Sequence, residues 1–560
     1  MPTSVKEALE IDRQNKNTLW YDAIMKEMKN VRVAFDIKER KTKPPPGYKH
    51  VNLMMIFDIK MDFTRKARLV ARGDQTDPPS TITYSSVVSR ESVRLAFLIA
   101  ALNGLNMKMF DIGNAYLNAP AAEKLYSFAG IEFGEEDQGK LMIISRALYG
   151  LKSSGAAYRA HFAQTLTDLG FISCLADADV WRKEASKPDG TRYYEYILTY
   201  VDDCLVVSMN PDGIIQRLEK DFGYRLKDVE EPRRYLGAMI NKYDMGKNQT
   251  WSMSAELYLK RALEEVENKW GNLSKLFRKD HLDIPVPTNY HPELDQTAML
   301  DDDDKQLYQS YIGILRWAVE LGRIDIAHSA GVMARFSAAP REHHLYIVLR
   351  IMAYCKKHIE SKIIFEPTPP DFNDIKWGHY DWKEFYPDAL KEELPPRMPE
   401  PLGKSVDISI FCDAAHATCH VTRRSTTGII IFVNGAPISW YSKRQNTIES
   451  SVFGSEYVAL KIAVEQNEAL RYKLRMMGIP ITGPSNGFCD NKSVVTNSTV
   501  PQSTLQKKHN MVAYHKVRES VAMEAIRITH ERGKVNMANV LTKFLPKPAF
   551  RHCCQCMMYR

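Results

Sequence analysis

The sequence predicts a multidomain protein of mixed α+β and α/β class, and three observations support this prediction. The chain of 560 residues is longer than one hydrophobic core usually supports, and its 44% of hydrophobic residues suffice for several cores. Apolar strand-like runs alternate with segments of helical periodicity. A proline-rich stretch at 366–403 excludes long helices and central strands and predicts a linker.

Two strand-like runs in the first half end in acidic residues. Asn106–Phe110 precedes Asp111, and Tyr194–Val201 precedes Asp202 and Asp203. Adjacent carboxylates repel each other, and Mg²⁺ relieves the repulsion because it prefers carboxylate and phosphate oxygens as ligands. These residues are therefore candidates for a two-metal phosphoryl-transfer site, although an ordinary Asp-Asp turn is the alternative for the dipeptide alone. Segments with helical spacing nearby are Val93–Leu102 and Ala156–Leu169.

The second half predicts a sheet covered by a helix, in the order strand, strand, strand, helix, strand. Asp413 ends the first strand, Glu456 lies on the apolar stripe of the helix, and Asp490 ends a later strand. Three carboxylates drawn to one buried corner would be costly without cations. The expected strands are Asp407–Asp413, Thr427–Val433, Ile438–Lys443, a run ending at Cys489, and Ile526–Thr529, with helical patterns from Val452 and over Met537–Phe544.

Charge and cysteine usage narrow the class of protein. The net charge is +8, and residues 404–560 hold 21 basic and 10 acidic residues, against 55 and 58 elsewhere. Such a surplus is typical of proteins that bind a phosphate backbone, although many basic domains bind none. The first residues are polar, which argues against a secretory signal. The chain has no long apolar run, which argues against a membrane-spanning helix.

Nine scattered cysteines argue against a disulfide framework. A zinc site at His552, Cys553, Cys554 and Cys556 is one interpretation of the C-terminus, and a frayed terminus is the preferred one.

Short words in the sequence point to one family. The first half contains, in order, KARLVARG (66–73), YSSVV (84–88), DIGNAYLN (111–118), ALYGLK (147–152), YVDD (200–203) and YLG (235–237). The second half contains FCDAAHA (411–417), RSTTG (424–428), SWYSKRQ (439–445), SEYVAL (455–460), CDN (489–491) and LTK (541–543). These words resemble the reverse transcriptase and ribonuclease H region of the Pol polyprotein of copia-type (Pseudoviridae) LTR retrotransposons.

The resemblance implies a right-hand polymerase with fingers, palm and thumb, followed by a connection segment and a ribonuclease H-like domain. We expect the following division: N-terminal tail 1–17, reverse transcriptase 18–265, connection segment 266–365, linker 366–403, ribonuclease H-like domain 404–548 and C-terminal tail 549–560. For Asp325 in the connection segment we expect a structural role as a helix cap or salt-bridge partner.

The family's polymerase residues carry over position by position. Asp111, Asp202 and Asp203 would hold two Mg²⁺ ions, for which Mn²⁺ can substitute, with a backbone carbonyl from Ile112. The resemblance further implies roles for residues that carry no metal. These are Lys66 and Arg68 for the incoming triphosphate, Tyr116 as a steric gate against ribonucleotides, Gly150 and Lys152 under template and nucleotide, and Leu236 and Gly237 as primer grip.

The resemblance also implies that Asp413, Glu456 and Asp490 hold the two nuclease ions. His515 matches the family, with an ordinary core or surface histidine as an equal alternative. One departure stands at a possible fourth position, where the family commonly has an acidic residue and this chain has Asn539. An amide oxygen binds metal without adding negative charge, which predicts weakened nuclease activity.

The implied function is that of an RNA- and DNA-directed DNA polymerase with a linked ribonuclease H, used in retrotransposon replication. Its partners would be an RNA template, a DNA primer-template, RNA–DNA hybrids and dNTPs, without a membrane, inside cytoplasmic retrotransposon particles; a later nuclear stage and the oligomeric state stay open. Two rival interpretations are a decayed or domesticated relic that binds nucleic acid without catalysis, and a cellular hybrid-degrading nuclease with an unrelated N-terminal module.

Overall fold

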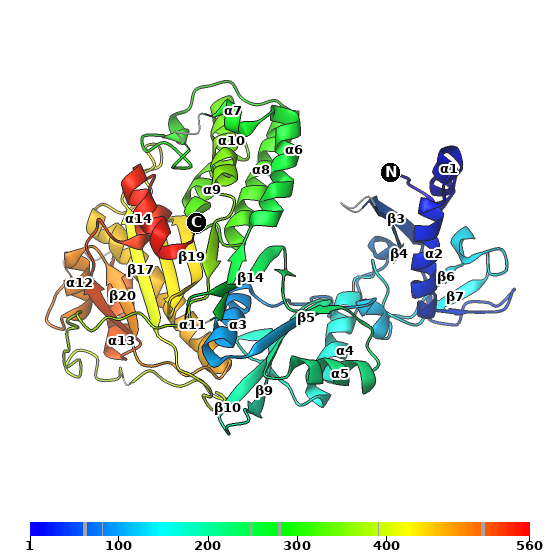
Figure 1. Cartoon of the computed structure of the whole chain (residues 1–560), viewed down its shortest axis with the longest axis horizontal. Helices are drawn as coiled ribbons and strands as arrows, with labels where there is room; N and C mark the ends of the chain where they lie inside the picture. Colours follow the sequence, from blue (N-terminus) through cyan, green and yellow to red (C-terminus); the bar gives the residue numbers. More distant parts are fainter. Residues whose placement is uncertain are drawn as a thin grey trace.

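The computed structural model describes residues 1–59, 64–80, 82–246, 249–277, 282–389, 391–505 and 510–559. An N-terminal lobe lies at one end of the elongated molecule, a twisted sheet forms its middle, and upright helices with a second large sheet fill the other end (Figure 1). Within these described ranges, no helix has the length and apolar character needed to cross a membrane.

The N-terminal lobe begins with a helix where a tail was expected, so that prediction for residues 1–17 is wrong. Ser4 caps the helix by accepting a hydrogen bond from the Glu7 N–H, and the buried Asp12 carboxylate accepts two more from the N–H groups of Trp20 and Tyr21. The elements of the lobe are α1 (Val5–Asn15), α2 (Leu19–Val31), the sheet β1 (Phe35–Ile37), β7 (Leu141–Ile144), β6 (Leu125–Phe128) and β2 (Lys49–His50), and the hairpin β3 (Leu53–Ile59) with β4 (Arg65–Ala71).

The middle of the molecule is a six-stranded sheet in the order β12-β5-β11-β10-β9-β8. The strands and helices predicted for the first half are confirmed here, with ends shifted by a few residues. The bounds are β5 (Asn106–Ile112), β8 (Ile172–Cys174), β9 (Asp177–Ser186), β10 (Arg192–Tyr200), β11 (Asp203–Ser208) and β12 (Leu226–Glu230), with α3 (Arg90–Asn103), α4 (Ser154–Asp168) and α5 (Pro211–Lys220).

A small sheet and a group of helices follow. Within the helical group, Arg323 and Asp325 form a fully buried ion pair at 3.0 Å, and the Tyr354 hydroxyl donates to the same carboxylate. The structural role predicted for Asp325 is thereby confirmed. The elements are β13 (Arg234–Tyr235), β14 (Ala238–Asp244), β15 (Gln249–Ser254) and β16 (Lys362–Ile364), with α6 (Glu256–Trp270), α7 (Leu273–Leu276), α8 (Asp302–Glu320), α9 (Ala327–Met333) and α10 (Glu342–Lys357).

The C-terminal sheet has the order β19-β18-β17-β20-β21, in which β17, β20 and β21 run parallel. The predicted sequence of three strands, a helix and a strand is confirmed. The helical pattern predicted over 537–544 gives only a 3₁₀ turn, Met537–Leu541. The bounds are β17 (Ile408–Ala415), β18 (Thr426–Val433), β19 (Ala436–Arg444), β20 (Ser485–Cys489) and β21 (Ile526–His530), with α11 (Val452–Met476), α12 (Lys492–Thr499), α13 (Met511–Ala522) and α14 (Lys547–Met557).

The C-terminal residues are packed, so the prediction of a frayed tail at 549–560 is wrong. Helix α14 buries Cys553 and Cys554, and Lys362 and Tyr559 exchange two backbone hydrogen bonds. The apolar face of α14 explains why this segment is packed and not frayed, because its Met and Cys side chains cover the edge of the core. Cys553 and Cys554 serve in that packing, whereas Cys556 is exposed.

The described residues of the proline-rich segment 366–403 contain no helix or strand, yet they pack closely on the C-terminal sheet. Phe372 and Trp377 contact the ring of Phe488, and the guanidinium of Arg527 lies 4.1 Å from the centre of the Trp377 ring. The segment therefore packs on the C-terminal sheet in addition to linking it to the preceding helical group.

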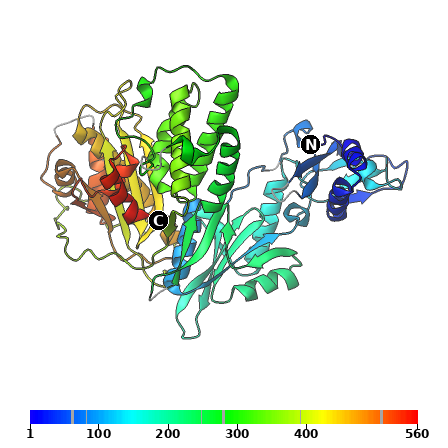
Figure 2. The ribbon, with the colours of Figure 1, turned by 45° about the horizontal axis from the view of Figure 1, so that its top comes forward.

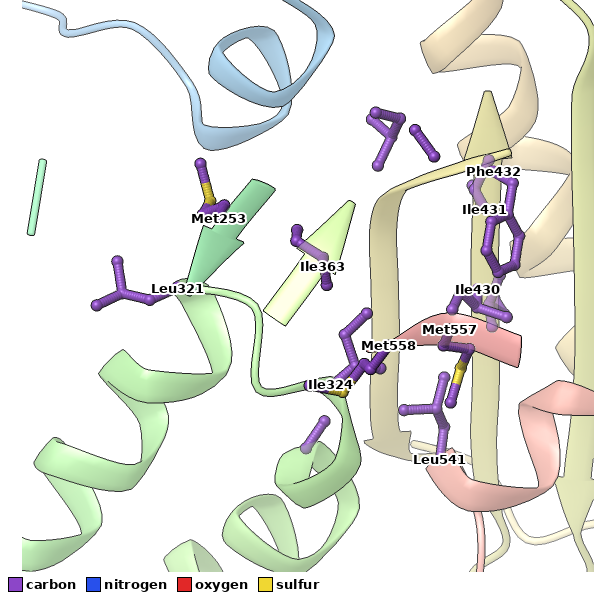
Figure 3. Packing of buried hydrophobic residues seen from close by; sticks show 14 of the residues in the cluster. Met253, Leu321, Ile324, Ile363, Ile430, Ile431, Phe432, Leu541, Met557 and Met558 are labelled. Atoms are coloured by element: carbon purple, nitrogen blue, oxygen red, sulfur yellow. The ribbon is translucent and has the colours of Figure 1, made fainter. Parts of the chain in front are cut away.

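One hydrophobic cluster joins the small sheet, the helical group and the C-terminal sheet. Figure 3 shows Met253 and Ile363 on one side of it and Ile430 on the other, with the C-terminal segment at the lower right beside Met557. Figure 2 shows the same contact from a second direction, with the upright helices against the C-terminal sheet. Other labelled members are Leu321, Ile324, Ile431, Phe432, Leu541, Met557 and Met558.

Candidate active sites

The first carboxylate cluster, Asp111, Asp202 and Asp203, forms where two hydrogen-bonded strands end. Strands β10 and β11 make a tight hairpin in which Tyr200 faces Asp203, and Asp111 on β5 lies directly opposite Asp203. Val201 at the tip has φ of +58°, a left-handed conformation that is strained for a β-branched residue. This left-handed conformation turns the chain sharply enough to bring Asp202 beside β5. There the Asp202 carbonyl accepts a 2.9 Å hydrogen bond from the Ile112 N–H.

The electrostatics of this cluster favour a bound cation. Burial, together with the charges of Asp202 and Asp111, raises the pKa of Asp203 to about 6. Burial and Asp202 also raise the pKa of Asp111, while Lys227 acts against that rise. Carboxylates that repel one another in a half-buried site are a suitable ligand set for a divalent cation. Ile112, predicted to lend its carbonyl, contributes its N–H to the hairpin.

Lys227 is a functional candidate that sequence reasoning missed. It stands on β12 directly opposite Asp111, in the strand at the edge of the central sheet. No local word marks this lysine, because only the pairing of β12 with β5 brings it to the carboxylates.

Tyr116 lies close to the first cluster and belongs to a chain of stacked groups. It sits on the 3₁₀ turn after Asn114, and the charge of Asp202 contributes, after burial, to raising the pKa of the Tyr116 phenol. Its ring centre is 4.8 Å from that of Tyr149, whose other neighbour is the guanidinium of Arg68 at 4.2 Å. The stacking thereby connects Arg68 on β4 to Tyr116, whose phenol lies within the electrostatic influence of Asp202, and the positive charge of Lys66 on the same strand acts to lower the pKa of Asp111.

Gly150 and Lys152 have contacts that explain their place in the fold. Gly150 has φ of +93°, and a Cβ there would lie 2.1 Å from the Ala71 carbonyl oxygen, so only glycine permits this crossing of two backbones. The Lys152 ammonium donates to the Thr76 carbonyl at 2.7 Å. Direct contact of either residue with a nucleotide stays a prediction.

Leu236 and Gly237 form the turn between β13 and β14. Both have positive φ, and the Leu236 carbonyl accepts a 3.1 Å hydrogen bond from Arg90. The buried Tyr235 beside them has a raised pKa, chiefly from burial and in part from the charge of Asp203. The charge of Asp203 thus reaches the residue beside this turn, and the role of Leu236 and Gly237 as a primer grip stays a prediction.

The second carboxylate cluster, Asp413, Glu456 and Asp490, lies at one end of the C-terminal sheet. Parallel strands β17 and β20 bring Asp413 and Asp490 to the same edge, and α11 carries Glu456 across it. A carboxylate oxygen of Glu456 accepts a 3.1 Å hydrogen bond from the Ala414 N–H. Asp413 accepts a hydrogen bond from the Thr542 hydroxyl and pairs with the Lys543 ammonium at 3.2 Å.

This second cluster is more deeply buried than the first. Burial, Asp413 and Cys489 raise the pKa of Glu456 to about 10, and burial and Asp413 raise that of Asp490. Donor atoms of Glu456, Asp490 and Cys489 lie within 4.8 Å of one another. The residues fit a divalent cation, which would replace the mutual repulsion by attraction. Cys489 is a neighbour that the sequence words did not single out as a site residue.

Asn539 lies in the turn beside the second cluster, whereas His515 makes its contact elsewhere. The Asn539 amide donates to the carbonyls of Gly533 and Asn536 at 2.7 and 2.8 Å, and a Cβ on Gly533 would lie 3.0 Å from an Asp490 carboxylate oxygen. Asn539 thus shapes the turn beside Asp490. The exposed His515 instead pairs with the Tyr386 hydroxyl at 2.8 Å, and no contact with the second cluster is recorded among the described residues.

The repulsion within the first cluster makes a testable prediction about stability. The pKa of Asp203 is raised from its usual 3.8 to about 6, so ionisation destabilises the folded state as pH rises through this interval. Asp203→Asn should therefore stabilise the metal-free protein at pH 7.5 by about 1–2 kcal/mol, since solvent screens part of the repulsion in this half-buried site, and have little effect near pH 4. Thermal unfolding in a chelator at the two pH values measures the difference.

The exposed Asp168 supplies the control, since Asp168→Asn removes a surface carboxylate of the same size. An Asp203→Asn protein no more stable than the Asp168→Asn protein at pH 7.5 would contradict the repulsion inferred here. Added Mg²⁺ should stabilise wild type more than Asp203→Asn.

Comparisons with known proteins find similarity over most of the chain. Residues 37–271 match the family model described as reverse transcriptase (RNA-dependent DNA polymerase). The chain is 25% identical, over 99% of its length, to the Retrovirus-related Pol polyprotein from transposon TNT 1-94 of Nicotiana tabacum, of which it covers 38%. It is 23% identical, over 96% of its length, to the corresponding polyprotein from transposon RE1 of Arabidopsis thaliana, of which it covers 33%.

The chain thus spans about a third of the length of these relatives. Among solved structures, the N-terminal RNase H domain of rv2228c from Mycobacterium tuberculosis, fused to maltose binding protein, is 13% identical, with 27% of this chain and 98% of that chain covered and a TM-score of 0.20. The chain is thus similar to the Pol polyproteins of these two transposons along nearly its whole length, and residues 37–271 match the reverse transcriptase family model.

Proposed function

We propose that this chain copies RNA and DNA templates into DNA and degrades the RNA strand of RNA–DNA hybrids, as part of retrotransposon replication. The observation that carries the proposal is the presence of two separate clusters of three carboxylates, each at one edge of its own sheet, with α11 contributing Glu456 to the second. Two such clusters serve two phosphoryl-transfer reactions, one that joins nucleotides and one that hydrolyses them.

In the proposed polymerase, the six-stranded sheet is the palm, the β3–β4 hairpin belongs to the fingers, and the β13–β14 turn with the following helix belongs to the thumb. The stacking of Arg68 on Tyr149 and of Tyr149 on Tyr116 supports this division, because it places a cation of the fingers near the palm carboxylates. A primer-template would then lie between the fingers and the β13–β14 turn.

The first cluster would hold two Mg²⁺ ions, with Mn²⁺ as a substitute, and bound metal supplies activation of the primer 3′ hydroxyl and neutralisation of the triphosphate. The residues of the chain perform the remaining tasks. Lys66 and Arg68 offer fixed positive charge to the triphosphate, and the Tyr116 ring occupies the space that a ribose 2′ hydroxyl would need. The turn at Leu236 and Gly237 orients the primer end.

In the proposed nuclease, Asp413, Glu456 and Asp490 would hold the cations, which supply an activated water for RNA hydrolysis. Lys543 pairs with Asp413 in the metal-free cluster and so reduces its negative charge until a cation binds. The high pKa of Glu456 means that cation binding must displace a proton from this carboxyl group at neutral pH.

The polymerase assignment is tested by Asp202→Asn, which removes a ligand with little change in volume. DNA synthesis on a primed RNA template should fall by about 100-fold or more, because the metals lose a charged ligand. Hybrid binding and thermal stability should be retained. Asp168→Asn is the matched control, and a variant that extends primers within severalfold of wild type would sink the assignment and favour a nucleic-acid-binding relic.

Sugar selection is tested by Tyr116→Val, which removes the ring and keeps an apolar side chain. The ratio of ribonucleotide to deoxyribonucleotide incorporation should rise by roughly 10–100-fold, since the steric exclusion is lost. Tyr158→Phe is the control, because it keeps the ring behind Tyr116 and removes a buried hydroxyl without a recorded partner. An unchanged ratio in Tyr116→Val would place the gate elsewhere.

The role of Asn539 is tested by comparing Asn539→Asp with Asn539→Ala. Both lose two hydrogen bonds to backbone carbonyls, which should cost about 1–3 kcal/mol of stability each. Only the aspartate adds negative charge near Asp490, so only Asn539→Asp should cleave hybrids at lower Mg²⁺ than wild type does, by about 10–100-fold in concentration. Overlapping Mg²⁺ curves for wild type and Asn539→Asp would exclude position 539 from the metal site.

A further inference from the structure

We propose that His291, Glu293 and His420 form a second kind of metal site, one that binds a divalent transition metal such as Zn²⁺ and joins two loops. The donor atoms of these three side chains all lie within 4.8 Å of one another. Two imidazoles with one carboxylate are a ligand set that suits Zn²⁺, whereas Mg²⁺ prefers oxygen ligands alone. The site is separate from both carboxylate clusters and does not depend on the proposed catalysis.

The distances are close to those that metal ligation needs. His291 Nδ1 lies 3.7 Å from a Glu293 carboxylate oxygen, and the ring centres of His291 and His420 are 4.3 Å apart at an interplanar angle of 82°. Donors around a tetrahedral zinc stand roughly 3.3 Å apart, as follows from bond lengths near 2.0–2.1 Å. Small side-chain rotations therefore suffice, and His291 and His420 are exposed enough to make them.

The loop that carries His291 and Glu293 is held in place by neighbouring groups. His291 precedes a 3₁₀ turn, Pro292–Leu294, and the Pro292 carbonyl is 2.9 Å from Nε2 of the buried His344. The Tyr290 ring packs against His343 on α10. These contacts restrict the loop before any metal binds, so less entropy is lost on binding.

The loop that carries His420, residues 416–425, is held by hydrogen bonds within the loop. The Ala417 N–H donates to the Ser425 hydroxyl at 3.1 Å, and the Arg423 N–H donates to the Cys419 carbonyl at 2.8 Å. The two loops are already in contact, because the backbone N–H of His420 donates a 2.9 Å hydrogen bond to a carboxylate oxygen of Glu293. A metal would strengthen a contact that the fold has formed.

The cluster stands in the wall of a cavity of about 620 Å³ between α9 and the C-terminal sheet. Arg335, Arg444 and Lys543 also line this cavity, and their positive charge opposes a cation that is held by electrostatic field alone. Direct ligation by nitrogen must therefore supply the binding free energy, which again favours Zn²⁺ over Mg²⁺. Thr542 and Lys543 in the same wall contact Asp413, so the site borders the second carboxylate cluster.

Metal titration of the full chain tests the proposal. The chelator-treated protein receives millimolar Mg²⁺ to fill the carboxylate clusters and is then titrated with Zn²⁺ against a chromophoric competitor. Wild type should bind one more tight equivalent than His291→Ala or His420→Ala, and Glu293→Gln should bind that equivalent at least about tenfold more weakly. The control His379→Ala removes another exposed histidine and should retain the equivalent.

The chain has nine cysteines that can also take Zn²⁺, so the difference between variants is the decisive quantity. A Co²⁺ titration gives a second readout, because the visible absorption of a four-coordinate site with nitrogen ligands should appear in wild type and be missing in His420→Ala. Equal melting temperatures of the metal-free proteins show that the variants fold. Identical Zn²⁺ stoichiometry and affinity in wild type, His291→Ala and His420→Ala would overturn the proposal and leave the cluster as a hydrogen-bonded contact between loops.

Discussion

A buried arginine on α3, Arg94, makes polar contacts between the parts that carry the two carboxylate clusters, within the hydrophobic cluster that they share. The Arg94 guanidinium donates to the carbonyls of Ile438 on β19 at 2.9 Å and of Glu320 at the end of α8 at 2.7 Å, and lies 3.9 Å from the centre of the Trp440 ring. Burial lowers its pKa to about 10, so it remains charged at neutral pH. A buried charge without these partners would be strongly destabilising, and the three parts are therefore held in one arrangement.

Both clusters place carboxylates where they repel each other, but the fold holds them there by different means. In the first cluster a strained residue, Val201, and a strand pairing force Asp203 against Asp111. In the second cluster, burial is the largest cause of the raised pKa of Glu456. Because that pKa is about 10, Glu456 keeps a proton at neutral pH. The first cluster is consequently closer to its ionised state, whereas the second must exchange a proton for a cation.

The parts of the fold that were predictable from sequence are those with local signals. Strands such as β5 and β10 alternate or bury short apolar runs, and the acidic residues at their ends, Asp111 and Asp202, follow directly along the chain. Lys227 could not be predicted, because its position opposite Asp111 arises from pairing between strands that are more than a hundred residues apart. The packed α14 was missed for a related reason, since its apolar face has meaning only beside a distant core.

Side-chain roles inside a correct motif were less predictable than the motif itself. The word at 541–543 indicated a nuclease position at Asn539, and the structure shows an amide whose two N–H groups hold the turn beside Asp490. Likewise, Gly150 fits a family word, and its geometry shows that two crossing backbones alone already require glycine there. A residue that matches a family pattern can therefore serve the fold, the chemistry or both, and only its contacts distinguish these.

The helical group explains how the two halves can influence each other. On one side Trp317 of α8 packs against Gly237 and under Arg90, beside the turn expected to hold the primer. On the other side the buried His328 of α9 lies 3.4 Å from the Ser442 hydroxyl, which itself donates to the Leu541 carbonyl next to Thr542. Since α8 packs on α9 and Thr542 contacts Asp413, a continuous series of packed groups runs from the β13–β14 turn to the second cluster. Under the proposed function, this packed series would couple the polymerase site to the nuclease site, because a duplex bound at both would contact two parts of one continuous core.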